Sequence, residues 1–381
     1  MAALLLYVAT LAPGITWADG SADSGELATA LYHWGVAHPT GYPLYTLLGA
    51  AFTHLPFGEV AHRTSLFSAL AAAGAVGVMV MYVARLAAPL GPFATRAGAV
   101  LAAAMLACSP MFWSQAVVTE VYAFNALLLV LVCVLLERAV ASPPSAQSLL
   151  PVSLAGGIAL SHHSTSGLVL AAAAVRLLLV HRLWRVPVWR WLPWPVLGLL
   201  ATAAVYALLP LRAAIANPAA VWGDTTTLPG LFDHVTGAAY RGALFSLAPQ
   251  VVVTKLPALA RMLLDQFGPL GYLLMLNGVW WLWQQWRDLA VWWLAVVLLT
   301  VVFALDYTVL DSEIYLLPAF VLVAAALGVG FAALADEVVA RVRRRNVQTT
   351  RIALMAGATA LAGASFAGAV APAISAIRVV C

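Results

Sequence analysis

The stretch PGITWADGSADSGELATALYHWGVAHPTGYPLYT, residues 13–46, is a polar segment in an otherwise apolar chain. It follows the first apolar run and holds three carboxylates, Asp19, Asp23 and Glu26. The chain of 381 residues is 64% hydrophobic and only 9% charged. Because charge inside a membrane is costly, acids clustered here predict a reaction centre at the membrane surface. The alternative is a solvated loop between two membrane helices.

Apolar runs recur along the whole chain and predict its class. With a mean hydropathy of +0.95, they indicate a polytopic membrane protein. The runs are continuous rather than alternating, which favours an all-α helical bundle over a β-barrel. At roughly 20 residues for each crossing, about eleven spans are expected in one domain, residues 1–381. They are residues 1–16, 64–84, 97–113, 119–136, 150–161, 164–181, 191–210, 268–286, 290–306, 315–334 and 352–373. The first is short for a span, so we expect either a trimmed first helix or a start further upstream.

Basic residues flank the expected spans on one side, which the positive-inside rule makes cytoplasmic. They are Arg85, Arg96, Arg138, Arg182, Arg185, Arg190, Arg287 and the cluster at 341–345. Most acids fall on the other side, so we expect an acidic extracytoplasmic surface. The net charge of +4 therefore reports topology and not nucleic-acid binding. The alanine-rich composition with one lysine, Lys255, is typical of a GC-rich bacterial genome, which indicates a bacterial plasma membrane.

Two long outer loops follow from this topology, residues 17–63 and 211–267. In the first loop we expect two surface helices, at 26–34 and 44–55. Pro39, Gly41 and Pro43 predict a rigid turn that keeps residues 38–43 out of helix. Asp23 and Glu26 are spaced as an N-cap and its capping-box-like partner, which gives both acids a structural alternative.

Several motifs resemble one known family. The string TLAPGITWADGSADSGELATALYHWGVAHPTGYPLYTLLG, residues 10–49, is similar to the amino-terminal signature of the transmembrane protein 260 family. That family includes the protein O-mannosyltransferases of animals. The resemblance runs from about residue 5 to 335 and departs from the usual pattern at 18–22, which leaves Asp19 and Asp23 as rival equivalents. Its other motifs are residues 109–116 with Glu120-Val121-Tyr122, 160–165 with His162 and His163, Leu209-Pro210-Leu211-Arg212 with Trp222-Gly223-Asp224, and 311–318.

This resemblance implies a C-type glycosyltransferase (GT-C) fold, with a sugar donor carried on a lipid phosphate and an acidic catalytic base in the first outer loop. A carboxylate there could accept the proton of an acceptor hydroxyl. We favour Asp23 over Asp19 and Glu26 as the base, since the start of a helix holds its backbone in place. The field at that helix end is expected to lower the pKa of Asp23. Glu26 would orient Asp23, the acceptor or a metal.

Nine further residues are expected to bind donor or acceptor. They are His38, Tyr42, Arg63, Glu120, His162, His163, Arg212, Trp222 and Asp224. We expect Arg212 and the two adjacent histidines to face the donor phosphates, because a guanidinium binds phosphate in a bidentate manner. The alternative for Arg212 is an interfacial arginine that reaches toward the headgroups.

The predicted activity is transfer of a sugar, with mannose as the animal precedent, by inversion from a polyprenyl phosphate to an extracytoplasmic protein, lipid or glycan. The alternatives are a non-catalytic membrane scaffold and a lipid-linked-sugar transporter or flippase. No internal repeat of a transporter and no His-Glu-x-x-His or Gly-x-Ser-x-Gly motif occurs. The three cysteines have no metal-ligand spacing, and the only cofactor considered is a divalent cation near the acids.

Overall fold

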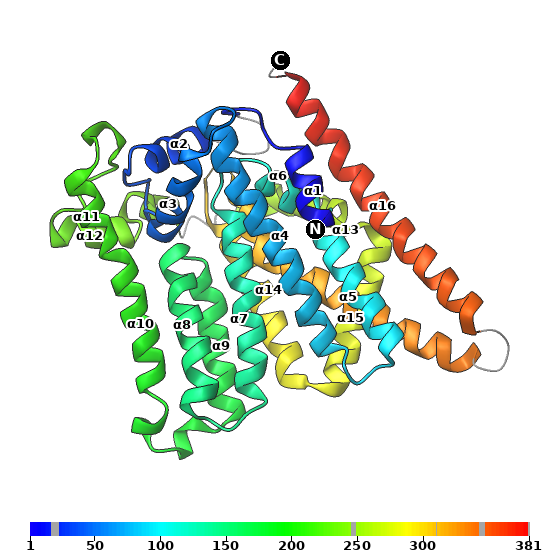
Figure 1. Ribbon diagram of the computed structural model, residues 1–381. Coiled ribbons are helices and arrows are strands. Elements are labelled where there is room, and N and C mark those ends of the chain that lie inside the picture. Colours follow the sequence, from blue (N-terminus) through cyan, green and yellow to red (C-terminus); the bar gives the residue numbers. More distant parts are fainter. Residues whose placement is uncertain (17–22, 245–248, 310, 343–346, 380–381) are drawn as a thin grey trace.

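The computed structural model describes residues 1–16, 23–244, 249–309, 311–342 and 347–379. Within these ranges the chain is helical, apart from loops and one isolated parallel bridge between Val36 and Val221. Figure 1 shows the long helices side by side as a bundle, with α16 slanting across its outside. The predicted all-α membrane bundle is confirmed.

The bundle contains long and short helices. The long ones are α4 (Val60–Leu86), α5 (Pro92–Ala107), α7 (Tyr122–Val140), α8 (Ala146–His162), α9 (Ser166–Val180), α10 (Pro193–Tyr206), α13 (Pro249–Gln285), α14 (Arg287–Asp306), α15 (Leu317–Val342) and α16 (Val347–Val379). The short ones are α1 (Ala2–Ala9), α2 (Ser24–Tyr32), α3 (Pro43–Ala50), α6 (Pro110–Ala116), α11 (Leu208–Ile215) and α12 (Leu228–Val235). Within the described residues, these 3₁₀ helices join them: η2 (Ala51–His54), η3 (Leu183–Arg185), η4 (Val188–Arg190), η5 (Pro218–Ala220), η6 (Ala238–Ala243) and η7 (Ser312–Leu316).

The number of spans differs from the expectation. By length and composition, 5 described helices could cross a membrane, or 6 if α5 and α6, which are bent by 66°, form one span. Each of the expected eleven segments overlaps a described helix, but α1 has only 8 residues, too few to cross. A break at Gly268, where φ is +65°, divides α13 into two parts, and only the second part matches the expected span.

The helix α15 forms the centre of the bundle. In the segment Ser312–Val342, 94% of the most apolar stretch of 18 residues is buried. Glycines allow its neighbours to approach closely, as is common between membrane helices. A Cβ atom added to Gly278 of α13 would lie 1.9 Å from the carbonyl oxygen of Ala326 in α15. A Cβ atom on Gly98 of α5 would lie 2.3 Å from the carbonyl oxygen of Gly328. These contacts pack the middle of α15 closely against α5 and α13.

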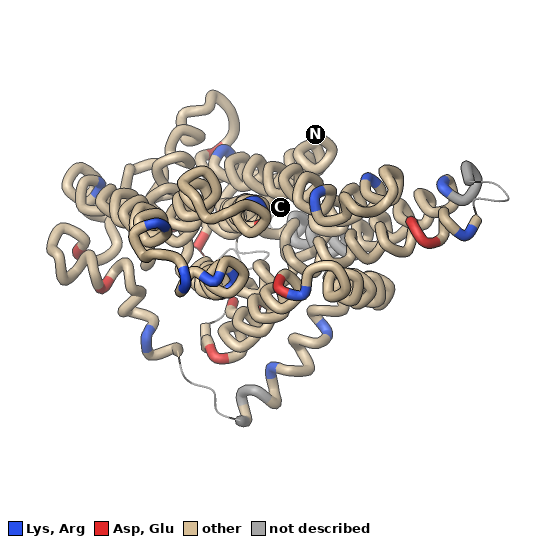
Figure 2. The backbone as a smooth tube through the Cα atoms, turned by 90° about the horizontal axis from the view of Figure 1, so that it is seen from below, with Lys and Arg blue, Asp and Glu red and all other residues tan. Residues whose placement is uncertain are grey.

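The two ends of the bundle differ in composition. The outer-loop helices α2, α3, α6, α11 and α12 lie at the upper end in Figure 1, whereas the connection between α9 and α10 lies at the lower end. That lower connection carries Arg182, Arg185 and Arg190. Figure 2 shows this end from below, with basic positions distributed over it in blue. These arginines therefore lie at the end of the bundle opposite the outer-loop helices.

The two outer loops are joined to each other. The backbone N–H of Val36 donates to the carbonyl of Ala220 at 2.9 Å, and the N–H of Trp222 donates to the carbonyl of Val36 at 2.9 Å. The expected surface helices of the first loop are present as α2 and α3 with η2. Residues 38–42 are non-helical as predicted, but Pro43 is the first residue of α3 rather than part of the turn.

Candidate active site

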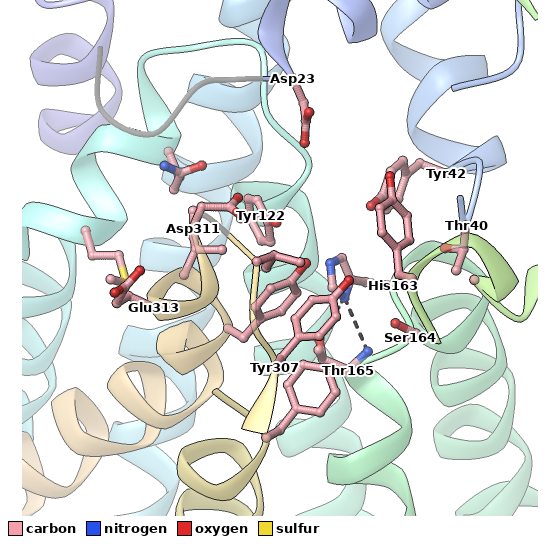
Figure 3. Close-up of a pocket in the computed structure, with 18 of the residues that line it drawn as sticks. Asp23, Thr40, Tyr42, Tyr122, His163, Ser164, Thr165, Tyr307, Asp311 and Glu313 are labelled. Carbon is pink, nitrogen blue, oxygen red and sulfur yellow. Dashed lines mark hydrogen bonds between the residues drawn. The ribbon is translucent and has the colours of Figure 1, made fainter. Parts of the chain in front are cut away.

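The outer end of the bundle contains a cavity of about 850 Å³. Its walls come from helices far apart in the sequence, from the start of α2 to the segment between α14 and α15. Its polar and aromatic lining includes Asp23, His38, Thr40, Tyr42, Gln115, Tyr122, His163, Ser164, Thr165, Tyr240, Gln266, Tyr307, Asp311, Glu313 and Tyr315. In Figure 3 the side chain of Asp23 enters from above, with Glu313 on one side and Tyr42 on the other.

Asp23 is the N-cap residue of α2, but its side chain makes no capping hydrogen bond. Asp23 and Glu26 therefore do not form the capping box that was the structural alternative for both acids, although Asp23 occupies the N-cap position. The start of α2 is held instead by Ser24, whose buried hydroxyl donates to the carbonyl of Thr119 at 3.1 Å. The carboxylate of Asp23, 41% exposed, is left to line the cavity.

The carboxylate of Glu26 binds a residue of the following turn. One oxygen accepts the backbone N–H of His38 at 2.9 Å, and the other is 2.7 Å from Nδ1 of the same residue. The opposite ring nitrogen, Nε2, lies 3.2 Å from the hydroxyl of Tyr42 and 3.6 Å from the carboxylate of Asp23. His38 thus connects the two acids, which do not contact each other in a capping box.

The pKa of Asp23 is raised from its usual 3.8, which is opposite to the predicted direction. Burial raises this pKa, the neighbouring His38 lowers it, and the charge of Glu26 adds to the rise. The helix-end field was expected to dominate, but the carboxylate accepts no hydrogen bond from the first turn of α2. Burial also raises the pKa of Asp311, and the charge of Asp23 contributes to that rise.

Aromatic rings form a continuous wall of the cavity. The ring of His163 lies 5.9 Å from that of Tyr42, 5.4 Å from Tyr122 and 5.8 Å from Tyr315. Tyr307 extends the wall, with its ring 5.2 Å from Tyr315. Such a cavity, with aromatic walls and a few polar groups, is typical of a small-molecule site.

The two adjacent histidines, His162 and His163, do not both face the cavity. His162 is fully buried, and its Nε2 lies 3.0 Å from the carbonyl of Val121. Only His163 lines the cavity, where its Nδ1 is 2.7 Å from the hydroxyl of Thr165. Burial lowers the pKa of His163, in the turn between α8 and α9, to about 3. A neutral ring cannot provide the positive charge that we expected next to a donor phosphate.

Two of the expected arginine ligands are used to hold the backbone. Arg212 is buried and donates to the carbonyls of Ala30, Trp34 and Gly35, with its guanidinium 5.3 Å from the Trp34 ring. Arg63 donates to the carbonyls of residues 53 and 55 at 2.6 and 3.0 Å. Neither side chain lines the cavity, so the placement of Arg212 against donor phosphates is corrected.

Three further predicted residues, Asp224, Trp222 and Glu120, do not line the cavity. Asp224 lies in an exposed turn, where its carboxylate accepts from the N–H and hydroxyl of Thr226. Trp222 is 47% exposed, and its ring is 6.2 Å from that of His38 on the outer side. Glu120 is buried behind the cavity wall, where burial raises its pKa well above the usual value. Asp19 lies outside the described residues.

Several cavity residues were not predicted. Asp311 and Glu313 belong to the motif at 311–318, but no role was assigned to them from the sequence. Tyr307 and Tyr315 flank that motif, and Tyr240 comes from η6. The sequence signal that could have identified them is the polar segment 307–315 between two apolar spans, which holds two tyrosines and two acids. Within the described part of the chain, no group of three histidine, cysteine or acidic side chains has the geometry to hold a metal ion. A divalent cation stays an untested prediction.

Solved structures with the same arrangement of helices define the class. The structure is similar to crystal structures of ArnT from Cupriavidus metallidurans. The ArnT structure bound to undecaprenyl phosphate has a TM-score of 0.59 and 16% identity, covering 96% of this chain and 76% of that chain. The apo structure has a TM-score of 0.61 and 13% identity, covering 99% and 76%. This protein is therefore a multi-pass membrane protein with a GT-C fold.

Sequence comparisons then show which proteins this chain is similar to. The family model described as Protein O-mannosyl-transferase TMEM260 N-terminal domain matches residues 23–186. The mouse protein O-mannosyl-transferase TMEM260 is 33% identical over 238 residues, 60% of this chain and 32% of the relative. The Dictyostelium discoideum protein is 26% identical over 301 residues, 72% of this chain and 35% of the relative. The aligned region thus spans about a third of each curated relative. The predicted resemblance to the transmembrane protein 260 family is confirmed.

Proposed function

We propose that this protein is an inverting membrane glycosyltransferase that uses a polyprenyl-phosphate sugar as donor and Asp23 as catalytic base. The observation that carries this proposal is the position of the Asp23 carboxylate in a large cavity at the outer end of a GT-C fold. A lipid-linked donor would enter such a cavity from the membrane. The reaction centre therefore lies at the membrane surface rather than in a soluble domain.

The names of related proteins support a donor and an acceptor class. The curated relatives are named protein O-mannosyl-transferases, and one structural neighbour is bound to undecaprenyl phosphate. We therefore propose mannose as the sugar, a polyprenyl phosphate as its carrier and a protein serine or threonine hydroxyl as the acceptor. We further propose the bacterial plasma membrane as the location, with the cavity facing the extracytoplasmic side, on the basis of the arginine distribution.

The chemistry needs a base on one side of the sugar and a leaving group on the other. Asp23 accepts the proton of the acceptor hydroxyl as its oxygen attacks the anomeric carbon. The bond from that carbon to the phosphate oxygen breaks, and its electron pair leaves with the polyprenyl phosphate. Attack opposite the leaving group inverts the anomeric centre. The aromatic wall with His163 would hold the sugar ring during this step.

The negative charge on the leaving phosphate requires a partner, and among the outer-loop arginines Arg63, Arg212 and Arg241 the last is the best placed. It follows Tyr240, which lines the cavity, and its side chain is 57% exposed. Its contacts are weak, a hydrogen bond of 2.9 Å to the hydroxyl of Thr236 and a 3.8 Å ion pair with Asp233. Unlike Arg63 and Arg212, it can therefore turn toward a phosphate without releasing a buried carbonyl.

Reconstitution tests the proposed function directly. Purified protein in proteoliposomes would receive radiolabelled undecaprenyl-phosphate mannose together with a serine- and threonine-rich peptide. We expect label on the peptide and free undecaprenyl phosphate as the second product. Direct use of a nucleotide-linked mannose would contradict the donor class. Movement of the labelled lipid across the bilayer with its sugar intact would instead favour a transporter, and binding without turnover a scaffold.

A further inference from the structure

The ring of His38 is the most tightly held ionisable group in the cavity wall. Glu26 accepts both its backbone N–H and its Nδ1–H, at 2.9 and 2.7 Å, so the residue is fixed at two points. The side chain is only 10% exposed, and Trp222 covers it from outside with a ring separation of 6.2 Å. A ring fixed in this way has one orientation, and Nδ1 is committed to Glu26.

The ring nitrogen of His38 that does not bind Glu26 is Nε2, and it lies next to the proposed base. Nε2 is 3.6 Å from Asp23 and 3.2 Å from the hydroxyl of Tyr42. Tyr42 itself remains a neutral donor or acceptor, since burial raises its pKa well above 10.0. When Nε2 carries a proton, it therefore has one charged partner in the cavity, the carboxylate of Asp23.

The charges around His38 favour its protonated form. Burial lowers the pKa of His38, but the hydrogen bond to Glu26 and the charges of Glu26, Asp23 and Asp311 outweigh burial and raise it. The groups that face it are Asp23 and Glu26 from α2, Tyr42 before α3, His163 from the α8–α9 turn, His234 from α12, and Asp311 before η7. Of these groups, only the two histidines oppose a positive charge, and burial lowers the pKa of both.

We propose that His38 is a positioning residue, which Glu26 fixes in a single orientation so that it presents a positive charge to Asp23 and keeps that carboxylate aligned and ionised. This inference rests on the proposed function, because it assumes that Asp23 acts as a base. In this proposal Glu26 orients His38 and does not itself contact the reacting atoms.

The need for such a residue follows from the position of Asp23. A partly buried carboxylate keeps its proton to a higher pH, and a protonated carboxyl cannot act as a base. An opposite charge within about 4 to 6 Å typically lowers the pKa of an aspartate by roughly one to three units. His38 is the group whose charge lowers the pKa of Asp23. The cavity can therefore exclude water from the sugar and still contain an ionised base.

The pH dependence of turnover separates this role from a structural one. In His38→Gln the positive charge is lost, so the pKa of Asp23 should rise. The acidic limb of the kcat/KM profile should move to higher pH by roughly one unit or more. At a pH below both acidic limbs kcat/KM should fall about tenfold or more, while the Kd for undecaprenyl phosphate should change by less than about twofold. His33→Gln is the matched control, because His33 is an exposed residue after α2 that contacts Tyr32 and not Asp23.

A second variant keeps the proposal testable if His38→Gln does not fold. Glu26→Gln preserves shape and can still accept the backbone N–H of His38, but it no longer favours the charged ring. Its acidic limb should also move upward, by less than in His38→Gln, since the charge of Glu26 itself raises the pKa of Asp23. Acidic limbs unchanged from wild type in both folded variants would overturn the inference. Absence of donor turnover by wild-type protein at every pH would instead remove the proposed function.

Discussion

The hydroxyl of Ser24 donates a hydrogen bond of 3.1 Å to the carbonyl of Thr119, which ties the start of α2 to the loop between α6 and α7. This contact fixes the backbone next to Asp23, because the side chain of Asp23 does not cap the helix. The proposed base, Asp23, is thus positioned by Ser24 and by the helix α2 that follows it.

Ser24→Ala should weaken this attachment. Loss of one buried hydrogen bond should lower the free energy of unfolding by about 1 kcal/mol, and kcat should fall because Asp23 becomes less well oriented. Thermal unfolding in detergent and single-turnover rates would measure both effects. Thr29→Ala is the control, since the exposed hydroxyl of Thr29 bonds only within α2. Equal rates for the two variants would show that the Ser24 contact does not orient the base.

Arg212→Ala should act on stability rather than on the donor. Its guanidinium is buried and binds three carbonyls at the end of α2, so its removal leaves those acceptors unpaired. We expect a loss of about 3 kcal/mol in the free energy of unfolding and an unchanged donor KM in the protein that remains folded. A raised donor KM without loss of stability would restore the phosphate role that the sequence predicted.

Arg241→Ala should raise the donor KM and leave stability nearly unchanged, the reverse of Arg212→Ala. The side chain is 57% exposed and its ion pair with Asp233 is long at 3.8 Å, so stability should change by less than about 0.5 kcal/mol. The donor KM should rise about tenfold, because a charge-assisted contact to the phosphate is lost. An unchanged KM, measured with undecaprenyl-phosphate mannose at low salt, would assign the phosphate to another group.

The wild-type pH profile should show an acidic limb above the value of an ordinary aspartate. In the proposed mechanism the ionised form of Asp23 is the active one, and the pKa of Asp23 is raised from 3.8. As the pH falls through that raised pKa, the proton returns to the carboxylate and kcat/KM declines. Rates of sugar release between about pH 3 and pH 8 would detect this limb. A profile that stays flat down to pH 3.8 would contradict the burial of the base.

The sequence was sufficient for the bundle and for the position of Asp23, since both depend on local patterns. Long apolar runs form helices in a membrane, and Pro39 and Gly41 keep the turn out of helix while Pro43 begins the second surface helix. The role of Glu26 could not be predicted in the same way. A helix-start pattern favours a contact three residues away, whereas the carboxylate binds His38, twelve positions further on. Only the folded turn brings that ring to it.

Longer-range contacts explain the other differences. Arg212 reaches carbonyls 177 to 182 positions away in the sequence, and no spacing rule links those segments. The acids at 311 and 313 enter the cavity because α15 returns beside α13, so their relation to Asp23 depends on helix packing. Composition predicted an acidic outer face but could not select which acids meet there.

The most direct test of the central claim is single-turnover transfer of radiolabelled mannose from undecaprenyl phosphate by Asp23→Asn. Asparagine has nearly the same shape and no basic carboxylate, so folding and donor binding should survive. The transfer rate should fall by about 100-fold or more. Glu59→Gln, which changes an exposed acid before α4, is the control and should retain the wild-type rate. Wild-type turnover by Asp23→Asn would contradict the assignment of Asp23 as the base.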